Sequence, residues 1–159
     1  MRTSTACNFV ERDSRGSSDD AVDGRSIYAL GVADFEWKLP HEWTSEPVWE
    51  LLAFTLFLTR QPNAGEEDEL RRIINSWYGV GVWGGWGVTD VGKGVLHNMG
   101  EILVISGSEP RVEWLVDMGS TTPAAIGGLM LCLQNWWLEV DAPIARLVLG
   151  HHDAFTAGR

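Results

Sequence analysis

The sequence predicts an α+β domain in which helices pack on one face of an antiparallel sheet. Apolar and polar residues alternate from 112 to 118, which is typical of a half-exposed strand. Apolar residues recur at helical spacing from 66 to 78, which indicates an amphipathic helix. The turn residues Gly107–Pro110 separate the 112–118 strand from an earlier apolar run, so a hairpin is expected there.

The first half of the domain is expected to begin with a strand and a helix. Residues 26–39 are apolar and β-prone, with alternation from Val32 onward, and Pro40 ends the strand. Ser45 is placed to cap a helix that continues to about Leu58. Because its apolar residues surround much of the helix, we expect it to be the central helix of the core.

The next expected element is the helix at 66–78, which follows the helix-breaking segment 61–65. Acidic residues fill its first turn, where they interact favourably with the positive end of the helix dipole. Two pairs of opposite charge are spaced four residues apart, so the acidic run has a structural explanation. These pairs are Glu67 with Arg71 and Asp68 with Arg72.

A glycine-rich stretch then interrupts the regular patterns. Between Gly79 and Gly100 lie eight of the 18 glycines of the chain, together with Trp83 and Trp86. The stretch has neither a helical nor a strand period. A loop or irregular hairpin with glycine bends, held in place by the tryptophans, is therefore expected.

The second half is expected to contain a hairpin, a helix and a final strand. Residues 101–106 form a buried strand that pairs with 112–118, and the Thr122-Pro123 dipeptide starts a helix. Gly127 and Gly128 would let this helix approach the sheet closely, and 144–149 is the last strand. The expected order is β-α-α-β-β-α-β. With the two early helices taken as one crossover, this is the split β-α-β order of ferredoxin-like folds.

Length and composition indicate a single domain. The 159 residues suffice for one ordinary core, and 45% of them are hydrophobic. Residues 1–25 are rich in Ser, Asp, Arg and Gly, so we expect a flexible N-terminal tail, a domain at 26–153 and a C-terminal tail at 154–159. The two cysteines, Cys7 and Cys132, form no disulfide framework, which favours a reducing compartment.

The charge of the chain indicates which classes of molecule it can bind. The formal net charge is −10, and nine of these negative charges lie outside the tail. Such a field repels nucleic acids and anionic membranes and favours a basic protein partner. No apolar run is long enough to span a membrane, and the N-terminus lacks the pattern of a secretory signal, so a cytoplasmic location is expected.

Two glycine motifs resemble nucleotide-binding sequences without the required context. Residues 79–84 match G-x-G-x-x-G, but they follow a helix, whereas a dinucleotide fingerprint follows a strand. Residues 87–94 approach the P-loop pattern, but Gly94 replaces the hydroxyl residue that would bind magnesium. Both matches are expected from chance in a glycine-rich stretch, and no cofactor is predicted.

Two ligand sites are predicted near the later elements. The first is an anion site at Ser120, Thr121 and Thr122, because a strand meets a helix N-terminus there; ordinary helix capping explains the same residues. The second is a metal site at His151, His152 and Asp153, whose side chains suit zinc and related ions. A solvated chain end is the competing explanation for the second set.

Acidic residues on the expected strands are candidates for partner contacts. Glu113 and Asp117 share one strand face, and Glu36 lies on the face of another expected strand. Paired carboxylates can perform acid-base chemistry if burial separates their pKa values, but on an open sheet face they more often form solvated ion pairs. No set of nucleophile, base and orienting residue is present in the pattern, so no catalytic residue is predicted.

Nine tryptophans are the strongest anomaly of composition. Four of them fall on expected core faces, and five are not assigned to the core by the pattern. The core set is Trp49, Trp77, Trp114 and Trp137, and the remaining set is Trp37, Trp43, Trp83, Trp86 and Trp136. Trp83 and Trp86 are candidate contacts to a protein partner, since tryptophan is frequent at binding hot spots; filling of gaps beside glycine is the alternative.

These observations support two main hypotheses of function and leave enzymatic activity undecided. The first is a non-enzymatic acidic module that binds a basic protein, as bacterial immunity or antitoxin proteins and regulatory domains do. The second is a small-molecule-binding domain or small enzyme with a pocket between sheet and helices. A homodimer and a role in a larger complex are further alternatives.

Overall fold

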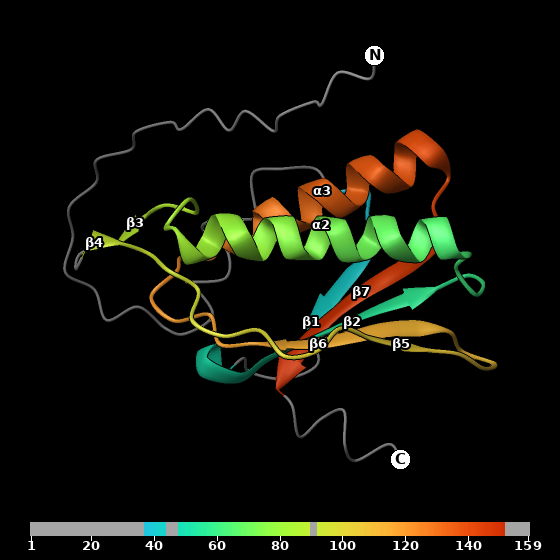
Figure 1. Cartoon of the computed structure of the whole chain (residues 1–159), viewed down its shortest axis with the longest axis horizontal. Coiled ribbons are helices and arrows are strands. Elements are labelled where there is room, and N and C mark those ends of the chain that lie inside the picture. The colour runs from blue at the N-terminus through green and yellow to red at the C-terminus, as the bar shows by residue number, and fades with distance from the viewer. Residues whose placement is uncertain (1–36, 44–47, 90–91, 152–159) are drawn as a thin grey trace.

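The computed structural model describes residues 37–43, 48–89 and 92–151 (Figure 1). Its elements are seven strands, one 3-10 helix and two α-helices within these residues. In order they are strand β1 (His41–Trp43), the 3-10 helix η1 (Trp49–Leu51), strand β2 (Leu52–Leu58), helix α2 (Ala64–Val82), strands β3 (Val88–Thr89), β4 (Gly92–Lys93), β5 (Leu103–Ile105) and β6 (Arg111–Val116), helix α3 (Ala124–Val140) and strand β7 (Ile144–His151).

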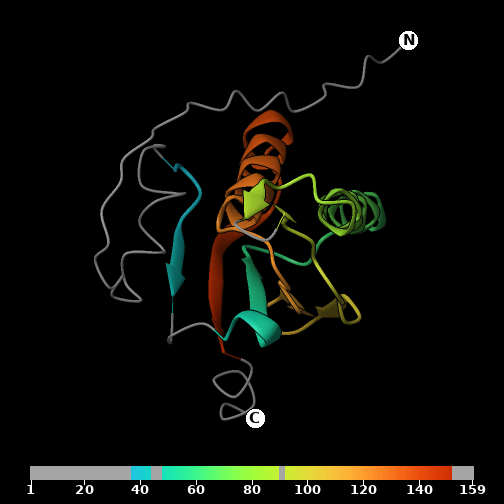
Figure 2. The same ribbon diagram turned by 90° about the vertical axis from the view of Figure 1, so that its left-hand side faces the viewer.

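Five strands form one mixed sheet, and both helices cover the same face of it (Figures 1 and 2). The strand order is β1-β7-β2-β6-β5, and β3 and β4 form a separate two-stranded hairpin. The predicted α+β class with helices on one face is confirmed. The prediction of a wholly antiparallel sheet is wrong at one edge, because β1 runs parallel to β7.

The predicted helix at 45–58 is wrong. Residues 49–51 form a single 3-10 turn, and Leu52–Leu58 is the central strand β2, paired antiparallel with β6 on one side and β7 on the other. Side chains on both faces of β2 are buried, including Phe54 and Thr55, each with about 1% exposure. A strand buried on both faces shows no alternation, so its apolar run resembles that of a buried helix.

Most of the strand predicted at 26–39 lies outside the described residues. Its last three residues, 37–39, are described and form no strand. Gln134 of α3 holds them instead, because its buried side-chain oxygen accepts hydrogen bonds from the N–H groups of Lys38 (2.7 Å) and Leu39 (3.0 Å). Pro40 therefore precedes a strand, β1, rather than ending one.

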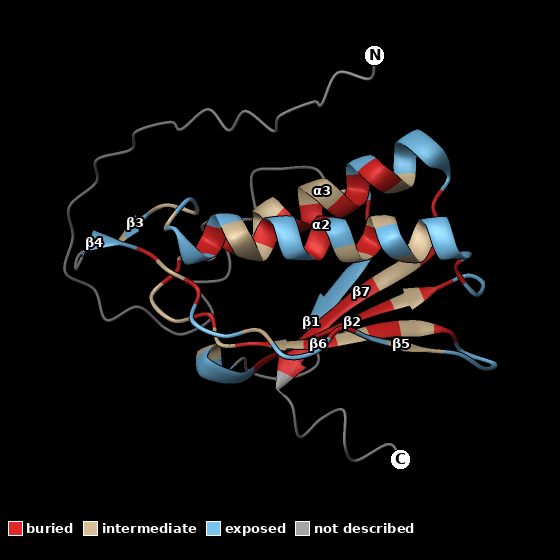
Figure 3. Ribbon diagram, in the orientation of Figure 1, coloured by how far each residue is buried: buried red, intermediate tan, exposed pale blue. Residues whose placement is uncertain are grey.

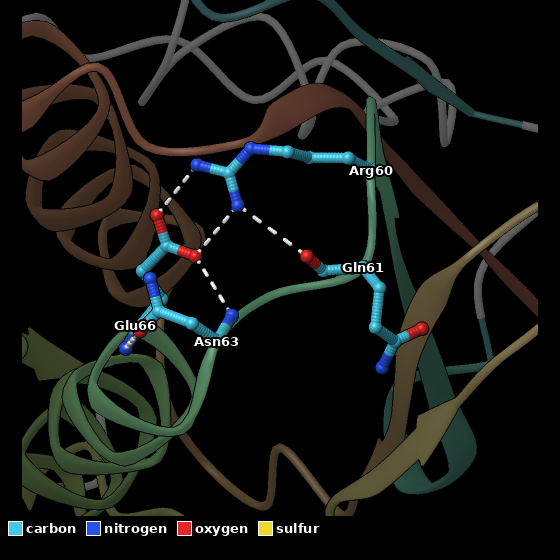
Figure 4. Close-up of polar contacts among 4 residues, drawn as sticks. All are labelled: Arg60, Gln61, Asn63 and Glu66. Atoms are coloured by element: carbon cyan, nitrogen blue, oxygen red, sulfur yellow. Dashed lines mark hydrogen bonds and ion pairs between the residues drawn. The ribbon is translucent and has the colours of Figure 1, made fainter.

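Helix α2 confirms the predicted helix and extends it at both ends. Asn63 caps its N-terminus: the Asn63 side chain accepts from the Glu66 N–H (3.0 Å), and the Glu66 carboxylate accepts from the Asn63 N–H (2.9 Å). Arg60 donates two hydrogen bonds to the same carboxylate, at 2.7 and 2.8 Å (Figure 4). The helix-breaking segment 61–65 thus supplies the cap of the helix that follows.

Of the two ion pairs expected on α2, one is confirmed and the other is wrong. Arg71 pairs with Glu67, and it also donates to the carbonyl of Ile102, which ties the helix to the segment before β5. Arg72 pairs with Glu69, three residues earlier, instead of Asp68. Both spacings bring side chains together on a helix surface, so the sequence alone did not separate them.

The hairpin predicted at 101–118 is confirmed as β5 and β6, which pair antiparallel. On β6 the predicted inward residues Val112, Trp114 and Val116 are buried against the helices. The prediction that the first strand is buried is wrong for Leu103, which is 43% exposed. The reason is that β5 lies at the edge of the sheet, where one side has no neighbouring strand.

Helix α3 and strand β7 confirm the last two predicted elements. Within the helix, Trp137 was predicted to be the core residue, but its neighbour Trp136 is the more deeply buried of the two. Trp136 is buried, with 8% exposure, whereas Trp137 is partly buried against the core. Asp141 ends α3 in the left-handed conformation (φ 52°).

Within the described residues, no helix has both the length and the apolar character that would be needed to cross a membrane.

The hydrophobic core fills the space between the sheet and the two helices (Figure 3). At its centre the Phe54 ring stacks on Trp114, with ring centroids 5.1 Å apart, and meets Trp77 edge-on at 5.7 Å. Trp77 also donates a hydrogen bond from its indole N–H to the carbonyl of Ala125 (2.7 Å). This aromatic cluster therefore joins β2, β6, α2 and α3.

Candidate functional site

A groove of about 840 Å³ lies between α2 and α3. Along α2 its lining follows one stripe of the helix, from Glu69 at one end to Val80 at the other. The two helices run in opposite directions (Figure 1), so Glu139, near the end of α3, lies at the Glu69 end of the groove. Trp77 and Trp136, both buried, contribute to its lining.

Trp86 closes the groove at its glycine-rich end. A Cβ atom on Gly128 of α3 would lie 2.4 Å from the Trp86 ring, and one on Gly81 of α2 would lie 3.0 Å from it. The Trp86 indole donates to the carbonyl of Trp77 (3.0 Å), and its own carbonyl accepts from the Thr122 hydroxyl (3.0 Å). Trp86 therefore packs against both helices, and Gly128 makes room for this ring rather than for the sheet.

Trp83 has the opposite environment, although it is only three residues away. Its side chain is 83% exposed, at the end of α2. Three other exposed apolar residues belong to the same end of the helix and the following hairpin: Val80 (44%), Val82 (37%) and Val88 (73%). Val80 and Val88 line the groove, whereas Trp83 and Val82 do not. We refer to Val80, Trp83 and Val88 as the apolar rim.

The other end of the groove is polar and predominantly acidic. Glu69 and Arg72 of α2 line it opposite Glu139 of α3. The hydrogen bond from Arg72 holds the pKa of Glu69 below its ordinary value. Glu139 is exposed and forms no ion pair with any other described residue.

The arginines of the described residues are neutralised within the chain. All five form ion pairs with glutamates: Arg60 with Glu66, Arg71 with Glu67, Arg72 with Glu69, Arg111 with Glu113, and Arg146 with Glu42. The described residues contain twelve acidic side chains against seven from lysine and arginine. Acidic groups therefore remain in excess after the arginines have been paired.

The carboxylates predicted to contact a partner do not gather at the groove. Glu113 lies on the sheet face opposite the helices, where it pairs with Arg111 (2.7 Å). Asp117 follows β6; it accepts from the Gly119 N–H (2.9 Å) and lies 3.4 Å from the His97 ring. Glu36 is outside the described residues. The aromatic and acidic parts of the predicted site therefore belong to different layers.

The hydroxyl groups of the predicted anion site are used within the fold. Ser120 accepts a hydrogen bond from the Val95 N–H (3.1 Å), and Thr121 donates to the carbonyl of Met118 (2.7 Å). Thr122 donates to Trp86, as described above. These bonds fasten the β6–α3 connection to the glycine-rich stretch and to Trp86. None of them caps α3, which has no side-chain hydrogen bond at its N-cap, so the explanation by helix capping is wrong.

The predicted metal site lies at the edge of the described chain. His151 is the last residue of β7, and His152 and Asp153 are outside the described residues. In the part of the chain that is described, no three His, Cys, Asp or Glu side chains gather as metal ligands do. The site at His151–Asp153 stays a prediction.

The two glycine motifs occur in the contexts that the sequence indicated. Residues 79–82 are the last turn of α2, and the 87–94 segment contains the β3–β4 hairpin. Gly87 and Gly92 adopt positive φ angles, 108° and 124°, which explains why glycine is needed in this tight connection. The predicted irregular hairpin is confirmed, although α2 takes up its first four residues.

Two features of the groove were missed by sequence reasoning. The stripe on α2 that includes Ile73 and Trp77 was assigned wholly to the core, whereas its outer members line the groove. Val88 and Glu139 carry no motif, and their position depends on how the two helices pack. The signal that was available is Gly128 of α3, because a glycine in a helix leaves room for a ring to pack against the helix.

The pKa of Glu66 gives a test of the contacts at the start of α2. Hydrogen bonds from Arg60 and from the Asn63 N–H lower it from 4.5 to about 2. A carboxyl group with a lowered pKa in the folded state stabilises the fold above its unfolded pKa, and this contribution is lost as the pH falls from about 4.5 toward 2. We therefore expect stability to fall in that window partly because Glu66 becomes protonated.

The Glu66→Gln variant removes the charge at position 66 but keeps the cap, because a glutamine side chain can also accept the capping-box hydrogen bond. We expect this variant to lose about 1 kcal/mol of unfolding free energy at pH 7 and to depend less on pH below 4.5. Urea unfolding of both proteins between pH 7 and pH 2.5 measures the effect. Equal pH dependence in the two proteins would show that Glu66 does not carry the predicted charge interaction.

No protein-family model, curated protein or solved structure matches the chain. Its function is therefore argued from the site alone.

Proposed function

We propose that this chain is an acidic, non-enzymatic interaction module that binds a basic protein, with Trp83 as an anchor of the contact. The observation that carries the proposal is the 83% exposure of Trp83 at the C-terminal end of α2, together with the exposure of Val80 in the last turn of that helix and of Val88 in the hairpin that follows. Large apolar side chains grouped on a surface are typical of protein-binding sites, and tryptophan is prominent among hot-spot residues. Immunity, antitoxin and regulatory proteins are the functional types that this description fits.

Charge supports a basic partner. The chain has a formal net charge of −10, and its described arginines are paired internally, so a partner meets mainly carboxylates. Complementary charge speeds encounter and disfavours acidic competitors such as nucleic acids. We propose the cytoplasm as the compartment in which this encounter occurs.

We also propose that the fold is a ferredoxin-like unit with one added strand. The elements β2, α2, β5, β6, α3 and β7 follow the order β-α-β-β-α-β. Their strands are arranged β7-β2-β6-β5, and every neighbouring pair among them is antiparallel. This arrangement supports the split β-α-β topology, and β1 then extends the sheet beside β7.

Capture from cell lysate tests the interaction. We expect the purified chain to retain a basic protein at low salt, and the Trp83→Ala variant to retain it at least tenfold more weakly, because loss of a hot-spot tryptophan costs about 2 kcal/mol or more. Thermal unfolding of Trp83→Ala should match the wild type, since the side chain is exposed.

Leu138→Ala is the matched control for this experiment. Leu138 is also an exposed apolar residue, at 53%, but it lies in the last turn of α3, at the opposite end of the helix pair from Trp83 (Figure 1). Retention by Leu138→Ala should equal that of the wild type. If Trp83→Ala retains the same protein as strongly as Leu138→Ala does, Trp83 is not an anchor and the proposed contact is wrong.

The second candidate function is binding of a small molecule in the groove. Its volume of about 840 Å³ falls within the range of small-ligand pockets, and three tryptophans line it. This location differs from the predicted pocket between sheet and helices, which the core occupies. A thermal-shift screen of metabolites tests this candidate: a ligand that raises the melting temperature of both wild type and Trp83→Ala would favour it over the protein-binding function.

A further inference from the structure

We infer that the groove between α2 and α3 receives an amphipathic helix of the partner, whose apolar residues meet the apolar rim and whose Lys or Arg residues lie at the Glu69–Glu139 end. This inference rests on the proposed function and specifies the part of the partner that is bound. It follows from three properties of the groove: its length along α2, the small residues that stand among the larger ones in its lining, and the difference in chemistry between its two ends.

The shape of the groove suits a helix. It follows one stripe of α2 from Glu69 to Val80, eleven residues along the helix, which corresponds to about 16 Å or three turns. An amphipathic helix can lay one face into a groove of this length, with residues three and four apart as its anchors. A bound helix of three or more turns would therefore lie along the whole groove.

Small side chains leave room for the residues of the incoming helix. The lining includes Ser76 of α2, Gly85 of the connection, and Ala124 and Cys132 of α3. Trp86, which is half-buried, adds an aromatic surface at the glycine-rich end. Apolar side chains of the partner would thus contact Trp86, Val80 and Val88, with Trp83 at the margin.

The carboxylates at the opposite end of the groove favour basic residues in the bound helix. Glu69 and Glu139 line this end with Arg72, and Arg72 is already paired with Glu69. The Glu139 carboxylate has no cationic partner among the described residues, so a Lys or Arg of the incoming helix would be its counterion. An acidic helix would place like charges together, which disfavours it.

The test uses the full chain labelled with ¹⁵N and a synthetic helical peptide of about 18 residues. The peptide carries leucine and phenylalanine on one stripe of its first half and lysine in its second half. We expect NMR signals of groove residues to shift on titration, among them the indole N–H signals of Trp77 and Trp86. A peptide of the same composition with apolar and basic residues scrambled should bind at least tenfold more weakly.

Two charge reversals provide matched variants. Glu139→Lys should raise the Kd of the peptide about tenfold, because it replaces an attractive contact with a repulsive one. Glu109→Lys changes the overall charge equally, but Glu109 lies in the β5–β6 turn and does not line the groove, so its effect should stay below about twofold at 0.15 M salt.

The possible results of these experiments distinguish a failure of the groove inference from a failure of the proposed function. Absence of binding, shifts confined to residues outside the groove, or equal effects of the two reversals would overturn the groove inference. If lysate capture still depends on Trp83 under any of these outcomes, the proposed function stands and another surface carries it. If capture is insensitive to Trp83 while the peptide occupies the groove, the groove inference stands and the assigned anchor is wrong.

Discussion

Replacing Trp77 with alanine is expected to lower the free energy of unfolding by about 4 kcal/mol, the largest effect of any substitution considered. The Trp77 side chain is 1% exposed, and its ring meets Phe54 edge-on. The substitution removes this contact, opens a cavity between α2 and the sheet, and leaves the Ala125 carbonyl without its donor. Urea unfolding, followed by circular dichroism, measures the loss.

Trp83→Ala is the matched control, because it makes the same chemical change a few residues further along, at the C-terminal end of the same helix. Trp83 is 83% exposed, so its removal should change the unfolding free energy by less than about 0.5 kcal/mol. A comparable loss in the two variants would mean that Trp83 is packed rather than exposed. That result would contradict both the fold and the assignment of Trp83 to a binding surface.

Gly128→Ala is expected to cost about 2 kcal/mol, the second largest effect. A methyl group at this position would lie 2.4 Å from Cζ3 of Trp86, so the ring must move out of the space between the helices. Its hydrogen bond to the Trp77 carbonyl would be strained or lost at the same time. Thermal unfolding measures the stability, and the fluorescence of the displaced indole should shift to longer wavelength.

Two further variants show whether the cost comes from Trp86. In the double variant Gly128→Ala with Trp86→Ala, the clash is removed, so the two effects should not add. Gly79→Ala on α2 has no atom within 4 Å of the new methyl group and should stabilise the protein slightly through helix propensity. Additive effects in the double variant would contradict the placement of Trp86 over Gly128.

The elements that the sequence predicted correctly are those with a one-sided pattern. Helix α2 has one buried stripe and strong cap residues, and β6 has one buried and one half-exposed face, so each shows its period clearly. Strand β2 was assigned as a helix because burial on both faces removes the alternation that identifies a strand. Its identity depends on β6 and β7, which lie far away in the sequence.

In the candidate site, too, the sequence pattern identifies features that depend on neighbouring residues and misses features that depend on residues far away in the sequence. Trp83 and Trp86 share a glycine-rich context, yet one is exposed and the other is packed between two helices. The difference comes from Gly128, in a helix remote in sequence, which provides the space for Trp86 alone. For the same reason the sequence indicated tryptophan as a binding candidate but did not indicate the groove, whose two walls come from separate helices.

Salt-dependent capture by the wild-type chain tests the central claim most directly. We expect a basic protein to be retained at 0.05 M salt and released at about 0.5 M salt, because salt screens the attraction between its charges and the acidic surface. We also expect Trp83→Ala to weaken retention at low salt. Retention of an acidic or neutral protein, independent of salt and of Trp83, would contradict the claim that this chain is an acidic module for a basic partner.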